Sequence, residues 1–365
     1  MPSKRRWDHC ITHRNPEIGP FVAEYFGGKN RNVLVIAAAG FDPRSAVVCR
    51  LLSGATTNLR AILIREQRPE PPGDLVSRAE ENLADLRGLI RSHKVLPISI
   101  FGEDDAVVGG RSIVQALRNE DLSGVTDVVV DGSAMSIGVS FPLIAFMLNR
   151  ARKIGMPRNL HVIVAFDAEM DEAIQPMPCD TVSYVHGFKG KLSLATNANA
   201  AKLWMPQLAR GRRLMLRKIH GNIDNLHDVC PILPFPAANP RLGDELAEYF
   251  LEEFEKAWRI DTRNIMYAAE NDPLDLYRTI LRIDDMRSSV FENLGGSKLV
   301  LSPVGSKVLA LGALMAAIER DLPVLHLEAI GYECPPLPPA EPESPKQDLI
   351  HVWLEGEVYP IEEIG

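Results

Sequence analysis

Cysteine is scarce in this chain of 365 residues, and its five copies are scattered at Cys10, Cys49, Cys179, Cys230 and Cys334. No two of them have the Cys-x-x-Cys spacing of a zinc ribbon or a thioredoxin-like redox site. The sequence also lacks a signal peptide and any apolar run long enough to span a bilayer. We therefore expect a cytoplasmic protein with reduced thiols, no metal site and no membrane partner.

Aromatic residues and excess positive charge are also missing. Phe, Trp and Tyr make up 6% of the sequence, too few to suggest a stacking platform for single-stranded nucleic acid. The formal net charge of −8 argues against a broad nucleic-acid surface. Hydrophobic residues at 46% and charged residues at 24% are ordinary for a folded domain, and the length allows one large core or two domains.

The first half of the chain alternates apolar strands with helical patterns. Five runs are predicted to be buried strands: 32–38, 59–65, 95–101, 126–131 and 160–166. Helices are expected between them over 43–52, 75–93, 110–118 and 135–148. Apolar strands separated by helices are typical of a mostly parallel sheet covered on both faces. This pattern predicts an α/β, Rossmann-like fold.

The second half continues the alternation less regularly. Strands are expected over 214–219, 228–233, 264–268 and 323–328. Helices are expected over 197–210, from a cap at Asp244 to Trp258, and from a cap at Asp272 with Pro273 at the first position. One large sheet with an insertion and two lobes both fit, and the length favours two lobes. The predicted organisation is a Rossmann-like lobe over 1–175, a second α/β lobe over 176–334, a proline-rich linker over 335–348 and a docking strand within 349–365, on a sheet edge of this chain or of a partner.

In open parallel sheets, ligands bind beyond the carboxyl ends of the strands, where the strand order reverses. The loop after the first strand reads Ala-Ala-Gly-Phe-Asp-Pro-Arg-Ser over 38–45. Gly40 permits a tight turn, Asp42 can cap a helix, and Arg44 has the geometry to fork onto a phosphate or a carboxylate. A plain helix start explains Asp42 and Pro43 equally well.

This loop resembles the cofactor loop of S-adenosylmethionine-dependent carboxyl methyltransferases, which read Gly-x-Gly-Phe-Asp-x-Arg, with Ala38 here in place of the first glycine. Glu66, at the end of the second strand, lies where such enzymes place an acid for the ribose hydroxyls. The resemblance implies S-adenosylmethionine as the cofactor and methyl transfer as the reaction.

A third loop, Asp-Gly-Ser-Ala-Met-Ser over 131–136, closes the fourth strand. Asp131 is a candidate to hold a ribose hydroxyl or a metal ion, and Ser133 or Ser136 can cap the following helix, which alone explains the loop equally well. No histidine stands nearby and the Gly-x-Ser-x-Gly elbow is absent, so no serine nucleophile and no catalytic residue are identified.

The fourth loop, Ser-Pro-Val-Gly-Ser-Lys over 302–307, joins a short apolar run to a helical pattern. A helix that opens directly after a strand presents free backbone N–H groups and the positive end of its dipole, which favour an anion such as phosphate. Gly305 lets the backbone approach closely, Lys307 adds a charge, and Ser302 and Ser306 complete the candidate site. The order of residues is not that of a Walker A loop. The alternative is a strand-to-helix turn with a solvated lysine.

This segment resembles the ligand loop of CARF-type domains, in which a Gly-Ser/Thr-Lys turn meets a cyclic oligonucleotide. Such domains are Rossmann-like sensors of prokaryotic antiviral systems and are usually dimeric. The resemblance implies a nucleotide-like ligand and a homo-oligomer or a subunit of a protein complex, in a defence system. We expect loops 40–44 and 302–307 to face one cleft. A nucleotide-dependent enzyme, such as a methyltransferase, and a non-catalytic structural subunit are the alternatives.

Overall fold

The computed structural model describes residues 5–190, 200–224, 226–292, 296–338 and 347–359. The chain forms two compact units. The N-terminal unit comprises His9–Ile174 with Gly331–Gly365, and the central unit comprises Met1–Asp8 with Gln175–Ile330. Among the helices described, none combines the length and the hydropathy needed to cross a membrane.

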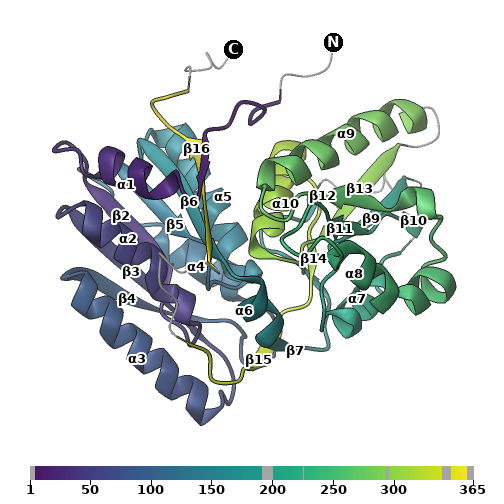
Figure 1. Cartoon of the computed structure of the whole chain (residues 1–365), viewed down its shortest axis with the longest axis horizontal. Helices are drawn as coiled ribbons and strands as arrows, with labels where there is room; N and C mark the ends of the chain where they lie inside the picture. The colour runs from purple at the N-terminus through teal and green to yellow at the C-terminus, as the bar shows by residue number, and fades with distance from the viewer. Residues whose placement is uncertain (1–4, 191–199, 225, 293–295, 339–346, 360–365) are drawn as a thin grey trace. The chain divides into compact units, whose positions relative to one another are not determined.

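A seven-stranded sheet runs through the N-terminal unit in the order β1-β16-β6-β5-β2-β3-β4 (Figure 1). The strands, in chain order, are β1 (Thr12–Arg14), β2 (Val33–Ala38), β3 (Leu59–Gln67), β4 (Ser92–Ser99), β5 (Asp127–Asp131), β6 (Asn159–Phe166) and β16 (Asp348–Glu355). The five strands from β2 to β6 are parallel, whereas β16 is antiparallel to β6 and β1 is antiparallel to β16. Every residue of β2, β5 and β6 is buried, as their apolar sequences predict.

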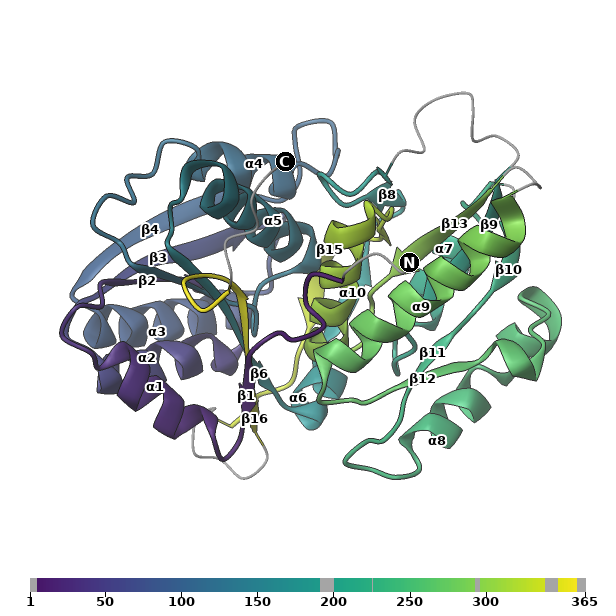
Figure 2. The ribbon, with the colours of Figure 1, turned by 90° about the horizontal axis from the view of Figure 1, so that it is seen from above.

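Helices cover both faces of this sheet. They are α1 (Ile18–Phe26), α2 (Val47–Ala55), α3 (Gly73–Leu89), α4 (Gly109–Leu117), α5 (Ile137–Ile154) and the short α6 (Ala168–Ala173). A 3₁₀ turn over Pro43–Ala46 precedes α2. Figure 2 shows α1, α2 and α3 on one face, with α4 and α5 on the other. The first face is closed by apolar side chains of α1, α2 and α3 against β2 and β3, which form one continuous core.

The central unit repeats the same topology. Its strands are β9 (Ala201–Pro206), β10 (Leu226–Val229), β11 (Ile232–Pro234), β12 (Met266–Ala268), β13 (Ser297–Ser302) and β14 (Leu325–His326). Its helices are α7 (Arg213–His220), α8 (Leu242–Tyr249), α9 (Pro273–Phe291) and α10 (Lys307–Arg320). β9 pairs in parallel with β10 and β13, β11 pairs in parallel with β12, and parallel bridges continue the sheet from residue 207 to β11 and from β13 to residue 324.

Among the five parallel strands of each unit, the one that comes first in the chain, β2 or β9, lies at the centre. The central unit has the spatial order β12, β10 with β11, β9, β13, β14, which corresponds strand for strand to β4, β3, β2, β5, β6. This is the doubly wound order 3-2-1-4-5, and its switch point lies between the first and fourth strands. The predicted fold class, Rossmann-like α/β with mostly parallel sheets and helices on both faces, is confirmed.

Two predictions for the second half are wrong in type, and two others differ from the structure in their bounds. Residues 201–206 of the expected 197–210 helix form strand β9, because this segment is the buried central strand of its sheet, and residues 197–199 lie outside those described. The expected strand 214–219 is helix α7, which buries Met215, Leu216 and Ile219 on one face. The expected strand 228–233 divides into β10 and β11, which pair with different neighbours.

The helix expected from Asp244 to Trp258 begins and ends at other residues. Its N-cap residue is Arg241, with Asp244 in the first turn, and α8 ends at Tyr249 before a π-helical turn over Glu253–Ala257. The cap at Asp272 is confirmed, since its side chain accepts a hydrogen bond from Leu274 N–H. Over 323–328 the strand is shorter than expected, and short ladders pair β14 with β8 (Ser183–Tyr184) and β15 (Ala329–Glu333) with β7 (Gln175–Pro178).

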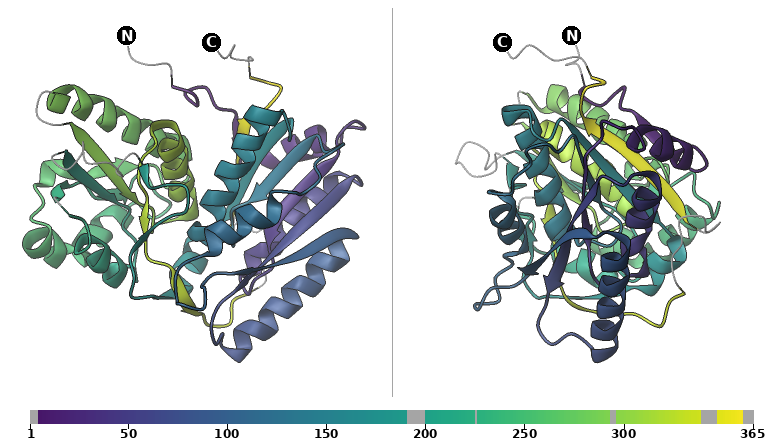
Figure 3. Two further views of the ribbon diagram at one scale, coloured as in Figure 1. Left: turned by 180° about the vertical axis from the view of Figure 1, so that it is seen from behind. Right: turned by 90° about the vertical axis from the view of Figure 1, so that its left-hand side faces the viewer.

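The C-terminal strand joins the sheet of its own chain. β16 lies between β6 and β1, so it is covered on both edges, and Figure 3 shows it in yellow beside the purple N-terminal segment. The first eight residues belong to the central unit, where Trp7 is buried and its N–H donates to the Tyr277 hydroxyl. Residues 339–346 of the proline-rich segment lie outside those described.

Candidate functional site

The switch point of the N-terminal unit brings four predicted residues to one place. β2 and β5 are neighbours in the sheet. The chain continues from β2 to β3 on one side and from β5 to β6 on the other, so the strand order reverses between them. Asp42 and Arg44 follow β2, whereas Asp131 ends β5 and Ser133 follows it. The charges of Asp42 and Arg44 act on the Asp131 carboxyl. All four residues are buried. The candidate site is therefore the carboxyl edge of the sheet between these two strands.

Arg44 already binds two carboxylates of its own chain. Its Nε and Nη2 donate to the Asp42 carboxylate at 3.0 and 2.7 Å, and its Nη1 donates to Asp171 at 2.7 Å. Burial lowers the pKa of Arg44, but the two carboxylates outweigh burial and raise it above the ordinary value. Asp42 also accepts the Arg44 backbone N–H at 2.9 Å and caps the 3₁₀ turn. Three of the five guanidinium N–H groups of Arg44 are therefore taken up by carboxylates of its own chain.

Only one of the two carboxylate oxygens of Asp131 has hydrogen-bond partners among the described residues. Its Oδ1 accepts the Ser133 backbone N–H at 2.9 Å and the Ser133 hydroxyl at 2.5 Å, and Ser133 Oγ in turn accepts Ala165 N–H at 2.8 Å. Its Oδ2 is buried and has no hydrogen-bond partner among the described residues. Burial raises the pKa of Asp131 to about 7, against the opposing effect of the bonds from Ser133. The carboxyl therefore changes charge near neutral pH.

The N-terminus of α5 lies beside Asp131. Ser136 is its N-cap residue by backbone conformation, yet the Ser136 side chain makes no capping bond, and its Oγ is buried without a partner among the described residues. The Ser136 N–H donates to Glu66 Oε1 at 2.9 Å, and Glu66 Oε2 pairs with Arg68 at 2.7 Å. Ribose hydroxyls at Glu66 would have to share its carboxylate with these two partners. The Val139 N–H donates to the Ser136 carbonyl at 3.2 Å, so the N–H groups of Ile137 and Gly138, which have no partner among the described residues, are the open donors of the site.

The corresponding switch point of the central unit lies between β9 and β13. Ser302 ends β13 and is fully buried, with its Oγ accepting Trp204 Nε1–H at 2.9 Å. Ser306 caps α10 through a bond from Leu309 N–H at 3.2 Å, and Lys307 is the first helical residue. A Cβ at Gly305 would lie 3.1 Å from Gln207 Cβ and Oε1, which is a tight contact. The close approach predicted for Gly305 is therefore an approach to Gln207.

Gln207 was not identified from the sequence. It is 1% exposed, its Nε2 donates to the Leu309 carbonyl at 3.1 Å, and its buried Oε1 has no partner among the described residues. Both switch points therefore contain an unpartnered buried oxygen next to a helix N-terminus. Loops 40–44 and 302–307 belong to different units, so their common cleft remains a prediction.

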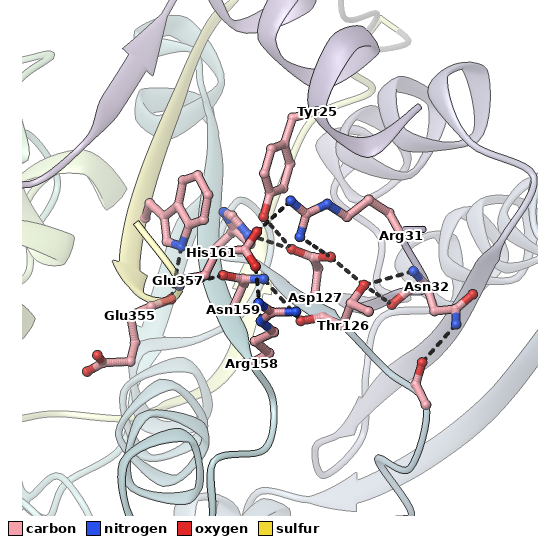
Figure 4. A network of polar contacts seen from close by, with 12 residues as sticks. Tyr25, Arg31, Asn32, Thr126, Asp127, Arg158, Asn159, His161, Glu355 and Glu357 are labelled. Carbon is pink, nitrogen blue, oxygen red and sulfur yellow. Dashed lines mark hydrogen bonds and ion pairs between the residues drawn. The ribbon is translucent and has the colours of Figure 1, made fainter. Parts of the chain in front are cut away.

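Sequence reasoning also missed a polar network at the amino edge of the seven-stranded sheet (Figure 4). Asp127 is fully buried and accepts hydrogen bonds from the hydroxyls of Tyr25 at 2.9 Å and Thr126 at 2.6 Å. It also contacts His161 Nε2 at 3.2 Å. Arg31 Nη1 lies 3.6 Å from Asp127 Oδ2. The sequence signal was a polar residue inside a strand that is otherwise apolar.

A row of three imidazoles continues this network across the sheet. His161 Nδ1 lies 3.0 Å from His351 Nε2, and His351 Nδ1 lies 3.0 Å from His13 Nδ1. Burial lowers the pKa of all three rings, most strongly that of His351, so they are neutral at pH 7. We call His13, His351 and His161 the histidine row. Nowhere in the described residues do three His, Cys, Asp or Glu side chains converge as a metal site would require.

Comparison with known proteins assigns this chain to no family. No protein-family model matches the sequence, and no curated protein matches it. Among solved structures, a universal stress protein from Archaeoglobus fulgidus DSM 4304 is similar over 82% of this chain and 97% of that chain, with 10% sequence identity and a TM-score of 0.24. A likeness of this size carries no argument about function, and the fold assignment rests on the strand order of the two units.

Proposed function

We propose that the protein binds a nucleotide-like ligand at the switch points of its sheets, as a sensor or accessory subunit of a prokaryotic defence system. The observation that carries the proposal is the pair of buried, unpartnered oxygens at the N-terminus of α5, Asp131 Oδ2 and Ser136 Oγ, among the described residues. A buried polar atom without a partner costs about 1–3 kcal/mol, and a ligand that supplies the partner recovers this free energy.

The chemistry of the site divides between the two oxygens. The Ser136 hydroxyl and the open N–H groups of the first turn of α5 donate hydrogen bonds, which suits a phosphate. Asp131 accepts a hydrogen bond when ionised and donates one when protonated, which suits a ribose hydroxyl or a base edge. A nucleotide carries both kinds of group within one small molecule.

The central unit supports a second site of the same kind. Gln207 Oε1 stands at its switch point as Asp131 Oδ2 stands at the other, and Ser306 takes the N-cap position that Ser136 has in α5. Lys307 is placed to add a positive charge beside a phosphate. We therefore expect each unit to bind a nucleotide-like group at its own switch point.

Binding is tested by thermal unfolding with ATP, S-adenosylmethionine and a cyclic oligoadenylate, together with native mass spectrometry of the purified protein. A ligand at a hundred times its Kd stabilises the fold by about 2.7 kcal/mol, which is a visible shift of the melting temperature. Ser136→Ala and Lys307→Ala should each reduce that shift, whereas Ser77→Ala, on the exposed surface of α3, should not. Native mass spectrometry also gives the oligomeric state.

The three ligands distinguish the sensor from the two alternative functions, a methyltransferase and a structural subunit. A shift with S-adenosylmethionine alone would favour a methyltransferase. If no ligand shifts the melting temperature and the three variants behave alike, ligand binding is excluded and the structural-subunit alternative is favoured.

A further inference from the structure

A hollow lies at the amino edge of the seven-stranded sheet, opposite the switch point. It has a volume of about 710 Å³ and is lined by Tyr25, Lys29, Arg31, Arg158 and Glu357, among others. Arg31 shortly precedes β2, and Arg158 immediately precedes β6. The amino ends of neighbouring parallel strands lie at one edge, so the topology brings these two arginines together.

Both arginines bind the same carboxylate. Arg31 Nη2 lies 2.5 Å from Glu357 Oε1, and Arg158 Nε lies 3.0 Å from Glu357 Oε2 (Figure 4). Each oxygen of Glu357 therefore has its own guanidinium, contributed by a separate loop. This is the arrangement with which arginines recognise carboxylate and phosphate groups.

Arg31 is held in place independently of Glu357. Its guanidinium lies 4.0 Å from the centre of the Tyr25 ring, and its Nη1 lies 3.6 Å from the buried Asp127 carboxylate. Asp127 is in turn fixed by the hydroxyls of Tyr25 and Thr126. Arg31 would therefore stay aimed into the hollow if Glu357 left, so the binding geometry is preorganised.

We infer that this hollow is a binding site for a small organic anion, and that Glu357 occupies the position of the ligand's phosphate or carboxylate group. Lys29 is the third cation of the lining, against the two carboxylates Glu24 and Glu357, and the aromatic ring of Tyr25 supplies an apolar wall. The volume of about 710 Å³ exceeds what one carboxylate fills, so room remains for the body of a ligand.

The segment that carries Glu357 has other anchors. The Tyr359 hydroxyl donates to the Trp353 carbonyl at 2.5 Å and accepts Ile11 N–H at 3.0 Å. The Glu357 backbone N–H donates to Asn159 Oδ1 at 3.0 Å. A change confined to the Glu357 carboxylate therefore removes the internal competitor and leaves the turn in place.

Titration calorimetry with inorganic pyrophosphate and with citrate tests the inference on the full chain. Glu357→Gln should bind at least one of them ten times or more tightly than the unaltered protein, because the competing carboxylate is gone. The matched control is Glu355→Gln, which removes a carboxylate two residues away that pairs with Arg152 instead. It should bind like the unaltered protein. Adding Arg158→Gln to Glu357→Gln should abolish the gain.

The two probes separate a phosphate site from a carboxylate site. Equal affinity of Glu357→Gln and Glu355→Gln for both probes would overturn the inference and leave Glu357 as a clamp on the C-terminal turn. A gain that survives Arg158→Gln would also overturn it, since the anion would then bind elsewhere. If Glu357→Gln fails to fold, Arg158→Gln alone decides: its side chain is 66% exposed, and it should weaken binding by the otherwise unaltered chain.

Discussion

Replacing Asp131 by Asn tests the electrostatics at the switch point of the N-terminal unit. Asn has the shape of Asp, and its Oδ1 can accept both bonds from Ser133 as the carboxylate does. Its Nδ2 takes the place of the unpartnered Oδ2, which adds a cost that does not depend on pH. The substitution therefore removes one titration and leaves the geometry nearly unchanged.

The magnitude follows from the pKa of Asp131, which burial raises from 3.8 to about 7. The folded protein holds this proton more tightly than the unfolded chain, so the free energy of unfolding falls as the pH rises from 3.8 to 7. At 1.36 kcal/mol per pKa unit, the whole effect is about 4 kcal/mol, and about 3 kcal/mol of it lies between pH 5 and pH 8. In Asp131→Asn, this fall of the free energy of unfolding with rising pH should be absent.

Urea unfolding at pH 5 and pH 8 measures the difference. From pH 5 to pH 8, the free energy of unfolding should fall by about 3 kcal/mol less in Asp131→Asn than in the unaltered protein. Other titrating groups, including the histidine row, cancel in this comparison. Glu81→Gln, which removes one exposed carboxylate of α3, should behave like the unaltered protein. The same pH dependence in Asp131→Asn and Glu81→Gln would refute the argument.

Three further predictions concern stability. Arg44→Ala leaves two carboxylates facing a buried gap and should cost about 3–5 kcal/mol in urea unfolding; a loss below about 1 kcal/mol would contradict the role given to Arg44. Gly305→Ala places a methyl group 3.1 Å from Gln207 and should cost about 1–3 kcal/mol by the same assay, whereas an unchanged midpoint would show that Gln207 moves aside. Burial holds the pKa of His351 well below 6.5, so the unfolded chain takes the proton first and stability should fall as the pH drops below about 6.5. His351→Gln should flatten that fall in thermal unfolding, and an equally steep fall would refute it.

The sequence predicted the sheet wherever strands are apolar on both faces. β2, β5 and β6 are such strands, and they were located within a residue or two. It failed at β9, whose central position in the sheet decides its conformation, and at α7, whose eight residues are too few to show a clear period. Both failures arise from packing partners that lie far away in the sequence.

The loops of the candidate site were located correctly, but the partners of their side chains were not. Arg44 binds Asp171, and Glu66 binds the N–H of Ser136, across separations of 127 and 70 residues. Single-sequence patterns carry no information about such pairs. The same reason hides the histidine row, whose members stand on three different strands or strand ends.

The histidine row has a direction that follows from Asp127. This carboxylate can only accept, so His161 Nε2 must carry the proton of its ring, and His161 Nδ1 must accept from His351 Nε2–H. His351 Nδ1 then accepts from His13 Nδ1–H, because a neutral imidazole has one N–H. The charge of one buried carboxylate thus fixes the tautomer of all three rings, and His13 Nε2 is left unprotonated with a free lone pair. A flip of any one ring would therefore break the hydrogen bonds that set the tautomers of its neighbours.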